Sequence, residues 1–227
     1  MNASTALQTV TRRAGAVPGG QGVAAHYGSP AGELAVCVQA VGLADRSDLS
    51  KLEVLGPPGA VSELVRRAAG APVAARGYVL ADGACWCAAS AERVIVLGEP
   101  ADGARLEAIR AVAPAGVQLV DRTPDWSAIA LVGRATLHTL AALGALANPR
   151  LAAPFGEATV ARERVELLLQ SDRRALMLVD PVGAAAVWGA IEEAGRAFGL
   201  SCVGGEAVRR FELLERRLDR APLWLAG

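Results

Sequence analysis

The pattern of apolar and polar positions repeats itself once along the chain. Residues 50–70 begin with a short apolar strand pattern, break at a glycine–proline pair and continue with an apolar stripe of helical spacing. Residues 125–147 repeat this order, with the break at Gly133. Because a glycine stands at the strand-to-helix corner in both copies, we interpret the two segments as equivalent.

A second pair of segments alternates with the first. Residues 92–112 and 173–195 each carry a buried-type strand pattern, then Pro100 or Pro181, then a helical stripe. Hairpin-like stretches precede them, and the first turns at Asp82-Gly83, a dipeptide that favours tight turns. Each half is therefore predicted as strand, helix, strand, strand, helix.

This duplication predicts an α+β fold built from two pseudo-symmetric βαββα half-domains, residues 45–118 and 119–205, within one folded unit of residues 23–227. Residues 1–22 show neither helical nor strand periodicity, so we expect a flexible N-terminal arm. A final helix is predicted from Glu206 to Asp219, followed by an apolar end that contains Trp224.

Charge and hydropathy exclude several classes of partner. The 227 residues include 23 Lys+Arg and 23 Asp+Glu, so the formal net charge is +0, and no long run of one sign occurs. This pattern does not favour nucleic acid or an anionic membrane surface as a partner. No stretch approaches the ~20 apolar residues of a membrane helix, and no leader pattern is present, so we expect a cytoplasmic protein.

Cysteine and histidine do not predict a metal site. Cys85 and Cys87 are two residues apart and point to one face of a strand, while Trp86 points to the other. No second cysteine pair or nearby histidine completes a zinc ligand set, so we interpret the thiols as core residues. Serine triads, phosphate loops and dinucleotide fingerprints are also missing from the sequence.

Residues 25–60 resemble a known family. The motifs are V-G-L-A-D-R-S at residues 41–47 and L-E-V-L-G-P at residues 52–57, and the likeness continues more weakly over nearly all of the chain after the arm. They resemble the opening of the aminomethyltransferase (glycine-cleavage T-protein) and folate-binding domain family. The resemblance implies a T-protein-like folate-binding domain with a central folate pocket, here without the C-terminal barrel of the enzymes.

The resemblance also implies where the folate pocket falls and what it lacks. The family's acidic hairpin turn matches Asp82-Gly83, but its paired carboxylates fall on Cys87 and Ala88, which cannot polarise an amine and folate. We therefore expect no catalytic residue of the family kind. Cofactor-binding positions carried over from the family, or lying beside its motifs, are Tyr78, Asp82, Trp86, Cys87, Arg173 and Arg209.

These losses resemble the gamma subunit of heterotetrameric sarcosine oxidase more than a T-protein. The leading hypothesis is a noncatalytic, folate-domain-like subunit of a flavin-dependent oxidase or demethylase acting on sarcosine or a related N-methyl amine. FAD would enter only through a partner, and the expected partners are larger flavoprotein subunits or further copies of this chain. The alternatives are a stand-alone tetrahydrofolate-binding protein or regulator, and an aminomethyltransferase with a rearranged active site.

Overall fold

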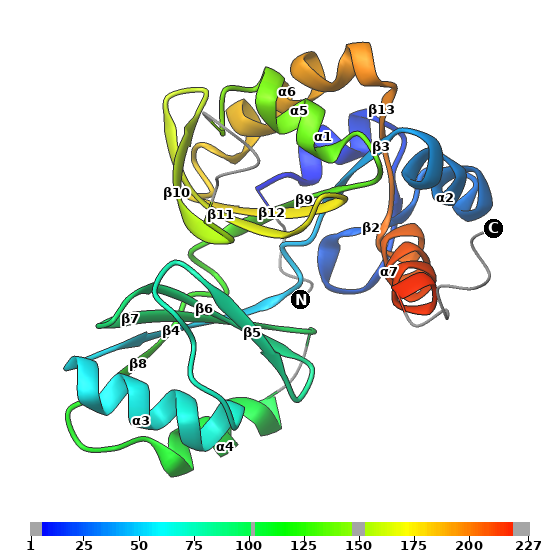
Figure 1. Cartoon of the computed structure of the whole chain (residues 1–227). Helices are drawn as coiled ribbons and strands as arrows, with labels where there is room; N and C mark the ends of the chain where they lie inside the picture. Colours follow the sequence, from blue (N-terminus) through cyan, green and yellow to red (C-terminus); the bar gives the residue numbers. More distant parts are fainter. Residues whose placement is uncertain (1–5, 101–102, 147–152, 220–227) are drawn as a thin grey trace.

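Two β-sheets stacked face to face form the centre of the molecule (Figure 1). The computed structural model describes residues 6–100, 103–146 and 153–219. The five-stranded sheet has the order β5 (Tyr78–Ala81), β6 (Ala84–Ser90), β7 (Arg93–Gly98), β4 (Ser50–Leu55), β8 (Gln118–Asp121). The six-stranded sheet has the order β10 (Phe155–Val160), β11 (Glu163–Ser171), β12 (Arg174–Val179), β9 (Ser127–Val132), β3 (Val41–Asp45), β13 (Leu200–Cys202). Every neighbouring pair is antiparallel except β13 and β3.

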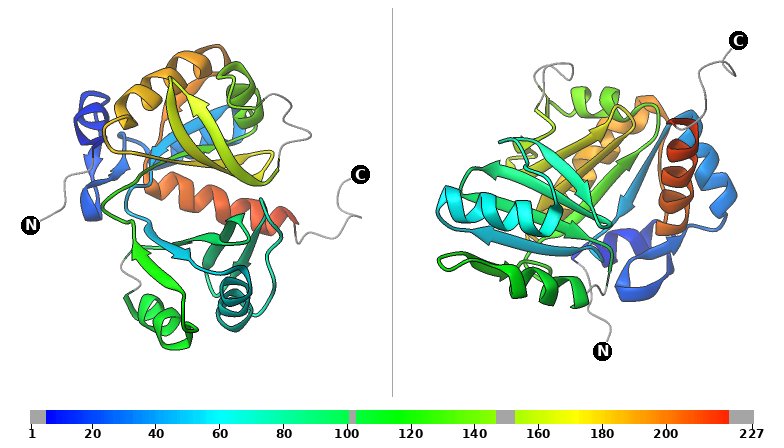
Figure 2. Two further views of the ribbon diagram at one scale, coloured as in Figure 1. Left: turned by 90° about the vertical axis from the view of Figure 1, so that its left-hand side faces the viewer. Right: turned by 60° about the horizontal axis from the view of Figure 1, so that its bottom comes forward.

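Helices cover the outer faces of both sheets. Helices α3 (Pro58–Ala69) and α4 (Gly103–Val112) cover the five-stranded sheet, and α5 (Thr136–Ala142) and α6 (Ala184–Gly195), which is followed by η2 (Arg196–Phe198), cover the six-stranded sheet. At one end, α2 (Pro30–Gln39) packs against α7 (Gly205–Asp219). Figure 2 shows α7 lying at the level of the gap between the two halves. No helix in the described ranges has the length and apolar character needed to cross a membrane.

The predicted α+β duplication is present in the structure. The orders β4-α3-β5-β6-β7-α4 and β9-α5-β10-β11-β12-α6 match element for element, and β4 and β9 each lie beside the third strand of the following meander. Each half has one strand more than predicted, because each hairpin-like stretch supplies two strands. The sheets also do not follow the predicted boundary at residue 118, since β8 pairs with β4 of the first half.

Residues 6–22 lie against the domain, which differs from the flexible arm expected from their pattern. They form α1 (Gln8–Arg13), β1 (Val17–Pro18) and η1 (Gly20–Gly22), and β1 pairs with β2 (Ala24–His26). The Leu7 side chain is completely buried in the core above the six-stranded sheet. Leu7 and the partly buried Val10 of α1 anchor this segment, and two apolar residues are too few to show a periodicity. Residues 1–5 and Trp224 lie outside the described residues.

Alternation along the strands divides the core into three clusters. On β6, Cys85 and Cys87 face the opposite sheet, whereas Trp86 faces α3 and α4, as the two-residue period predicts. Helix α3 covers its side of the sheet with Val61, Leu64 and Val65 and ends at Gly70. That glycine has φ +70°, the left-handed conformation that ends many helices.

A charged network crosses between the two sheets. Glu53 of β4 accepts hydrogen bonds from Arg93 Nε (2.7 Å) and Arg122 Nε (2.8 Å), and its side chain is 5% exposed. Arg93 Nη1 also donates to Glu166 Oε1 of β11 in the opposite sheet at 2.5 Å. Both guanidinium carbons lie about 6 Å from the Trp126 ring centre. Arg93 therefore joins a buried carboxylate of each sheet.

Replacing Arg93 by methionine should lower the free energy of unfolding by about 3 kcal/mol, because Glu166 would remain buried without its cation. Urea denaturation measures the change. Arg110→Met, which removes an exposed pair with Glu107, should cost less than about 0.5 kcal/mol. Equal losses in the two variants would show that the cross-sheet network is not a stabilising element.

Lys51, the chain's lone lysine, is buried on β4. Its Nζ donates to the carbonyl oxygens of Leu49 (2.8 Å) and Ser47 (3.0 Å), and the residue is 1% exposed. Burial lowers its pKa from the usual 10.5 to about 8, although nearby Asp48, Asp45 and Asp121 act in the opposite direction. The charged form is therefore disfavoured in the folded protein.

This shift gives a pH dependence of known sign. Between pH 8 and 10.5 the unfolded chain binds more protons at Lys51 than the folded chain, so the contribution of Lys51 to stability rises with pH. The unfolding free energy of the wild type minus that of Lys51→Met should grow by up to about 3 kcal/mol over this window. Chemical denaturation at several pH values measures it. A constant difference would mean that the lysine titrates normally.

Candidate functional site

A narrow cleft lies between the two sheets, at the side where α7 packs. We call it the inter-sheet cleft, and its volume is about 110 Å³. Strands of both sheets and α7 supply its walls, which include apolar residues such as Leu97 and Leu168. Its charged lining residues are Arg46, Glu99, Arg174, Glu212 and Arg216.

Direct contacts between the sheets close one side of the cleft. The Tyr78 hydroxyl on β5 donates to the Gln170 carbonyl oxygen on β11 at 2.8 Å. The Phe155 amide on β10 donates to the Arg76 carbonyl oxygen at 2.9 Å. Partial burial raises the pKa of Tyr78, so its hydroxyl keeps its proton and acts as a donor at neutral pH.

The two thiols of β6 form a contact beside the cleft. Cys85 Sγ and Cys87 Sγ are 3.5 Å apart, and only Cys85 lines the cleft. The pKa of Cys87 is raised well above its usual value, first by its hydrogen bond with Cys85 and then by burial. A protonated, buried thiol is neither a nucleophile nor a metal ligand, so Cys87 acts as a core residue, and Cys85 packs in the same core cluster. Within the described ranges, no three His, Cys, Asp or Glu side chains converge as a metal site.

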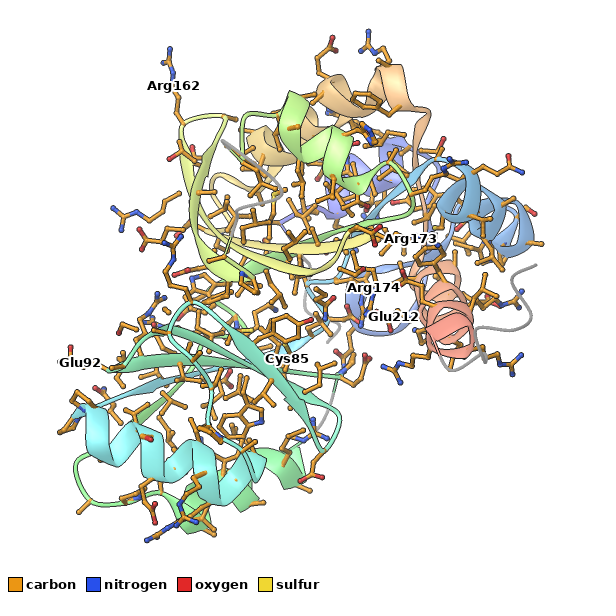
Figure 3. All side chains as sticks on the ribbon, in the orientation of Figure 1. Cys85, Glu92, Arg162, Arg173, Arg174 and Glu212 are labelled. Carbon is orange, nitrogen blue, oxygen red and sulfur yellow. The ribbon has the colours of Figure 1, made fainter. Side chains whose placement is uncertain are left out.

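The guanidinium groups of the cleft lie against carboxylates of the same chain. Arg174 Nε lies 2.7 Å from Glu215 Oε2, a close ion pair without the alignment of a hydrogen bond, and Arg174 Nη1 lies 3.8 Å from Glu212 Oε1. Figure 3 shows Arg174 and Glu212 together where the six-stranded sheet meets α7. Arg46, 4% exposed at its side chain, contacts Asp48 at 3.1 Å and Glu99 at 3.2 Å.

The six positions predicted from sequence do not converge. Tyr78 and Cys87 are register partners on β5 and β6 and pack in the core between the sheets. Trp86 is buried on the outer face, and Asp82, Arg173 and Arg209 are exposed in two turns and on α7.

Their neighbours line the cleft instead, namely Cys85, Gly83, Arg174 and Val208. Arg174 could have been found from strand alternation, because it lies one residue from Arg173, and Arg46 stands within the matched motif itself. Glu212 and Arg216 had no such signal, because their place depends on how α7 packs.

The comparisons with known proteins give the fold. No protein-family model and no curated protein matches the sequence. Among solved structures, aminomethyltransferase T of the glycine cleavage system from Bartonella henselae is similar, with a TM-score of 0.76 and 16% identity over 91% of this chain and 61% of that one. The chain therefore spans less than two thirds of that enzyme's length.

A chain of heterotetrameric sarcosine oxidase from Corynebacterium sp. U-96, solved in complex with pyrrole 2-carboxylate, is also similar. Its TM-score is 0.61, with 18% identity over 76% of this chain and 93% of that one. At these identities the likeness establishes architecture and not activity. The chain has the fold of a T-protein-like domain, and the sheets in its described part do not close into a barrel.

The two tyrosines of the chain give a matched test of the cross-sheet hydrogen bond. Tyr78→Phe should lower the free energy of unfolding by about 1 kcal/mol, because the Gln170 carbonyl loses its donor. Tyr27→Phe removes a buried hydroxyl that has no hydrogen-bond partner among the described residues, so stability should stay equal or rise. Urea unfolding of both variants measures the two changes in the free energy of unfolding. A larger loss of stability for Tyr27→Phe than for Tyr78→Phe would contradict a stabilising role of the cross-sheet hydrogen bond.

Proposed function

We propose that this protein is a noncatalytic, folate-domain-like subunit of a flavin-dependent complex that oxidises or demethylates sarcosine or a related N-methyl amine. The observation that carries the proposal is the content of the inter-sheet cleft. The cleft of this T-protein-like fold holds the Cys85 thiol and the Arg174 ion pairs, with the Tyr78 hydrogen bond beside it, whereas one-carbon transfer would need an available carboxylate. Similarity to a chain of a heterotetrameric sarcosine oxidase supports assembly with larger subunits.

Tetrahydrofolate does not fit the inter-sheet cleft. Sites for drug-sized ligands have volumes of about 300–1,000 Å³, and this cleft has about 110 Å³. The guanidinium of Arg174, which could have bound an anionic ligand, is already paired with Glu212 and Glu215 of α7. Folate entry would have to break these pairs and the hydrogen bond of Tyr78. No chemical step is therefore assigned to folate in this chain.

The carboxylates near the cleft do not replace the missing acid. Glu99 is 60% exposed at its side chain and paired with Arg46, and Glu212 points to Arg174. A carboxylate that is held by a guanidinium is already engaged and is not available to polarise a substrate amine. In this proposal, the ion-paired residues of this chain form a rigid surface for the partner subunit. The partner supplies the flavin and the amine chemistry.

Assembly and catalysis can be tested together. The chain should co-purify at fixed stoichiometry with a larger flavoprotein when the two are co-expressed, and the complex should consume sarcosine or another N-methyl amine. The isolated chain, given tetrahydrofolate and the aminomethyl substrate of a T-protein, should make no methylenetetrahydrofolate and release no ammonia, whereas a T-protein in the same assay serves as the positive control. One-carbon transfer by the isolated chain would overturn the proposal.

Ligand binding separates this proposal from a stand-alone folate protein. Saturating 5-formyltetrahydrofolate should leave the melting temperature of the isolated chain unchanged, because a ligand stabilises a protein only by binding its folded state. A concentration-dependent rise, abolished by Arg174→Met, would instead establish a folate-binding cleft. Differential scanning calorimetry measures the shift.

A further inference from the structure

Helix α7 lies at an outer corner of the molecule (Figure 1). Its inner side packs Ala207, Val208 and Phe211 into the core between the sheets. The exposed side chains of the helix form what we call the α7 outer face, which consists of Arg209, Arg210, Leu213, Leu214, Arg216 and Arg217. None of these six takes part in the ion pairs between α7 and Arg174.

The charges of α7 are segregated between its two sides. Glu212 and Glu215 lie against Arg174 of the six-stranded sheet. Glu206 pairs with Arg210 at 2.5 Å. Within the described part of the chain, the other three guanidinium groups of the outer face make no ion pair, namely those of Arg209, Arg216 and Arg217. The outer face is therefore cationic, although the formal net charge of the chain is +0.

Exposed leucines accompany these free cations. Leu213, which is 56% exposed, lies four residues after Arg209 and three before Arg216, so the three side chains share one side of the helix. Arg216 also lines the inter-sheet cleft, together with Leu80 of β5, which is 58% exposed. The surface thus continues from α7 to the mouth of the cleft. Apolar side chains flanked by arginines are typical of protein–protein interfaces.

This combination of charge and apolar groups fits one kind of partner. We propose that the α7 outer face and Leu80 form a docking surface for an acidic protein surface that carries apolar side chains. Carboxylates of the partner lie on Arg209 and Arg216, and its apolar side chains lie on Leu213 and Leu80. The identity of the partner rests on the proposed function, in which this acidic surface belongs to the larger flavoprotein subunit.

The same residues disfavour other occupants. A second copy of this chain, bound through the same face, would place α7 against α7 and oppose arginines to arginines. An anionic membrane binds helices with a broad free apolar side, and the apolar side of α7 is buried in the domain core. Nucleic acid would pair the arginines with phosphates but leave Leu213 and Leu80 without apolar contacts.

The first experiment uses a synthetic acidic peptide as the probe and measures its fluorescence anisotropy with the full chain. The peptide is an amphipathic helix of about 20 residues with leucines on one side and glutamates on the other. It should bind saturably and at least about fivefold more tightly than a peptide with glutamine in place of glutamate. A peptide with serine in place of leucine should also bind at least about fivefold more weakly.

Variants of the chain locate the binding site. Arg209→Gln combined with Arg216→Gln should weaken the acidic peptide at least about fivefold, and Leu213→Ser should do the same. Arg196→Gln and Val182→Ser are the matched controls, because both residues are exposed and lie outside the α7 outer face. Both controls should bind the peptide as tightly as the wild type does.

A second experiment connects the surface with the proposed function. When the chain is co-expressed with a larger flavoprotein, Arg209→Gln combined with Arg216→Gln should lower the yield of the complex at least about fivefold, whereas Arg196→Gln should not. If no flavoprotein assembles even with the wild type, the proposed function fails. The peptide titration tests the α7 outer face independently of that outcome.

Several results of the titrations would overturn the docking surface. They are no saturable binding of the acidic peptide, equal binding of the glutamate and glutamine peptides, and full affinity in the folded double arginine variant or in folded Leu213→Ser. Tighter binding to phosphatidylserine vesicles or to duplex DNA than to the peptide would assign the face to a membrane or a nucleic acid instead. Circular dichroism and the melting temperature establish that each variant is folded before titration.

Discussion

The two halves of this protein are joined by a partly buried guanidinium. Arg93 reaches from the five-stranded sheet to Glu166 of the six-stranded sheet while it also contacts Glu53 of its own sheet. A charge in such a position is tolerated only when its partners are in place, so the network fixes how the sheets face one another. The hydrogen bond between Tyr78 and Gln170 is a second link between the same two sheets.

The groups that fill the space around the inter-sheet cleft are the physical basis of the proposed noncatalytic role. Thiols, a phenol and internal ion pairs fill the centre of the domain and stabilise it. Polar groups that already bond one another in this way are not available to bind a ligand. In the proposed function, the flavin chemistry is therefore assigned to a partner polypeptide.

The sequence pattern was strongest as a predictor where local chemistry decides the structure. The period of two in β6 placed Cys85, Trp86 and Cys87 on their observed faces, and the strand–glycine–helix repeat predicted the duplication. It was weakest where long-range packing decides. The place of Leu7 depends on a core formed by residues far along the chain, and the pairing of Arg174 with Glu212 depends on where α7 packs. Neither leaves a pattern in its own segment.

The pairing of β3 has a consequence for how the chain can assemble. This strand precedes all of the five-stranded sheet in sequence, yet it lies between β9 and β13 of the other sheet. The backbone groups of β3 can therefore pair only after β9 and β13 have been synthesised. Closing the long loops between these strands is slow. The halves are interlocked by this strand, so evolution could not separate them again into two free-standing modules by cutting the chain between them.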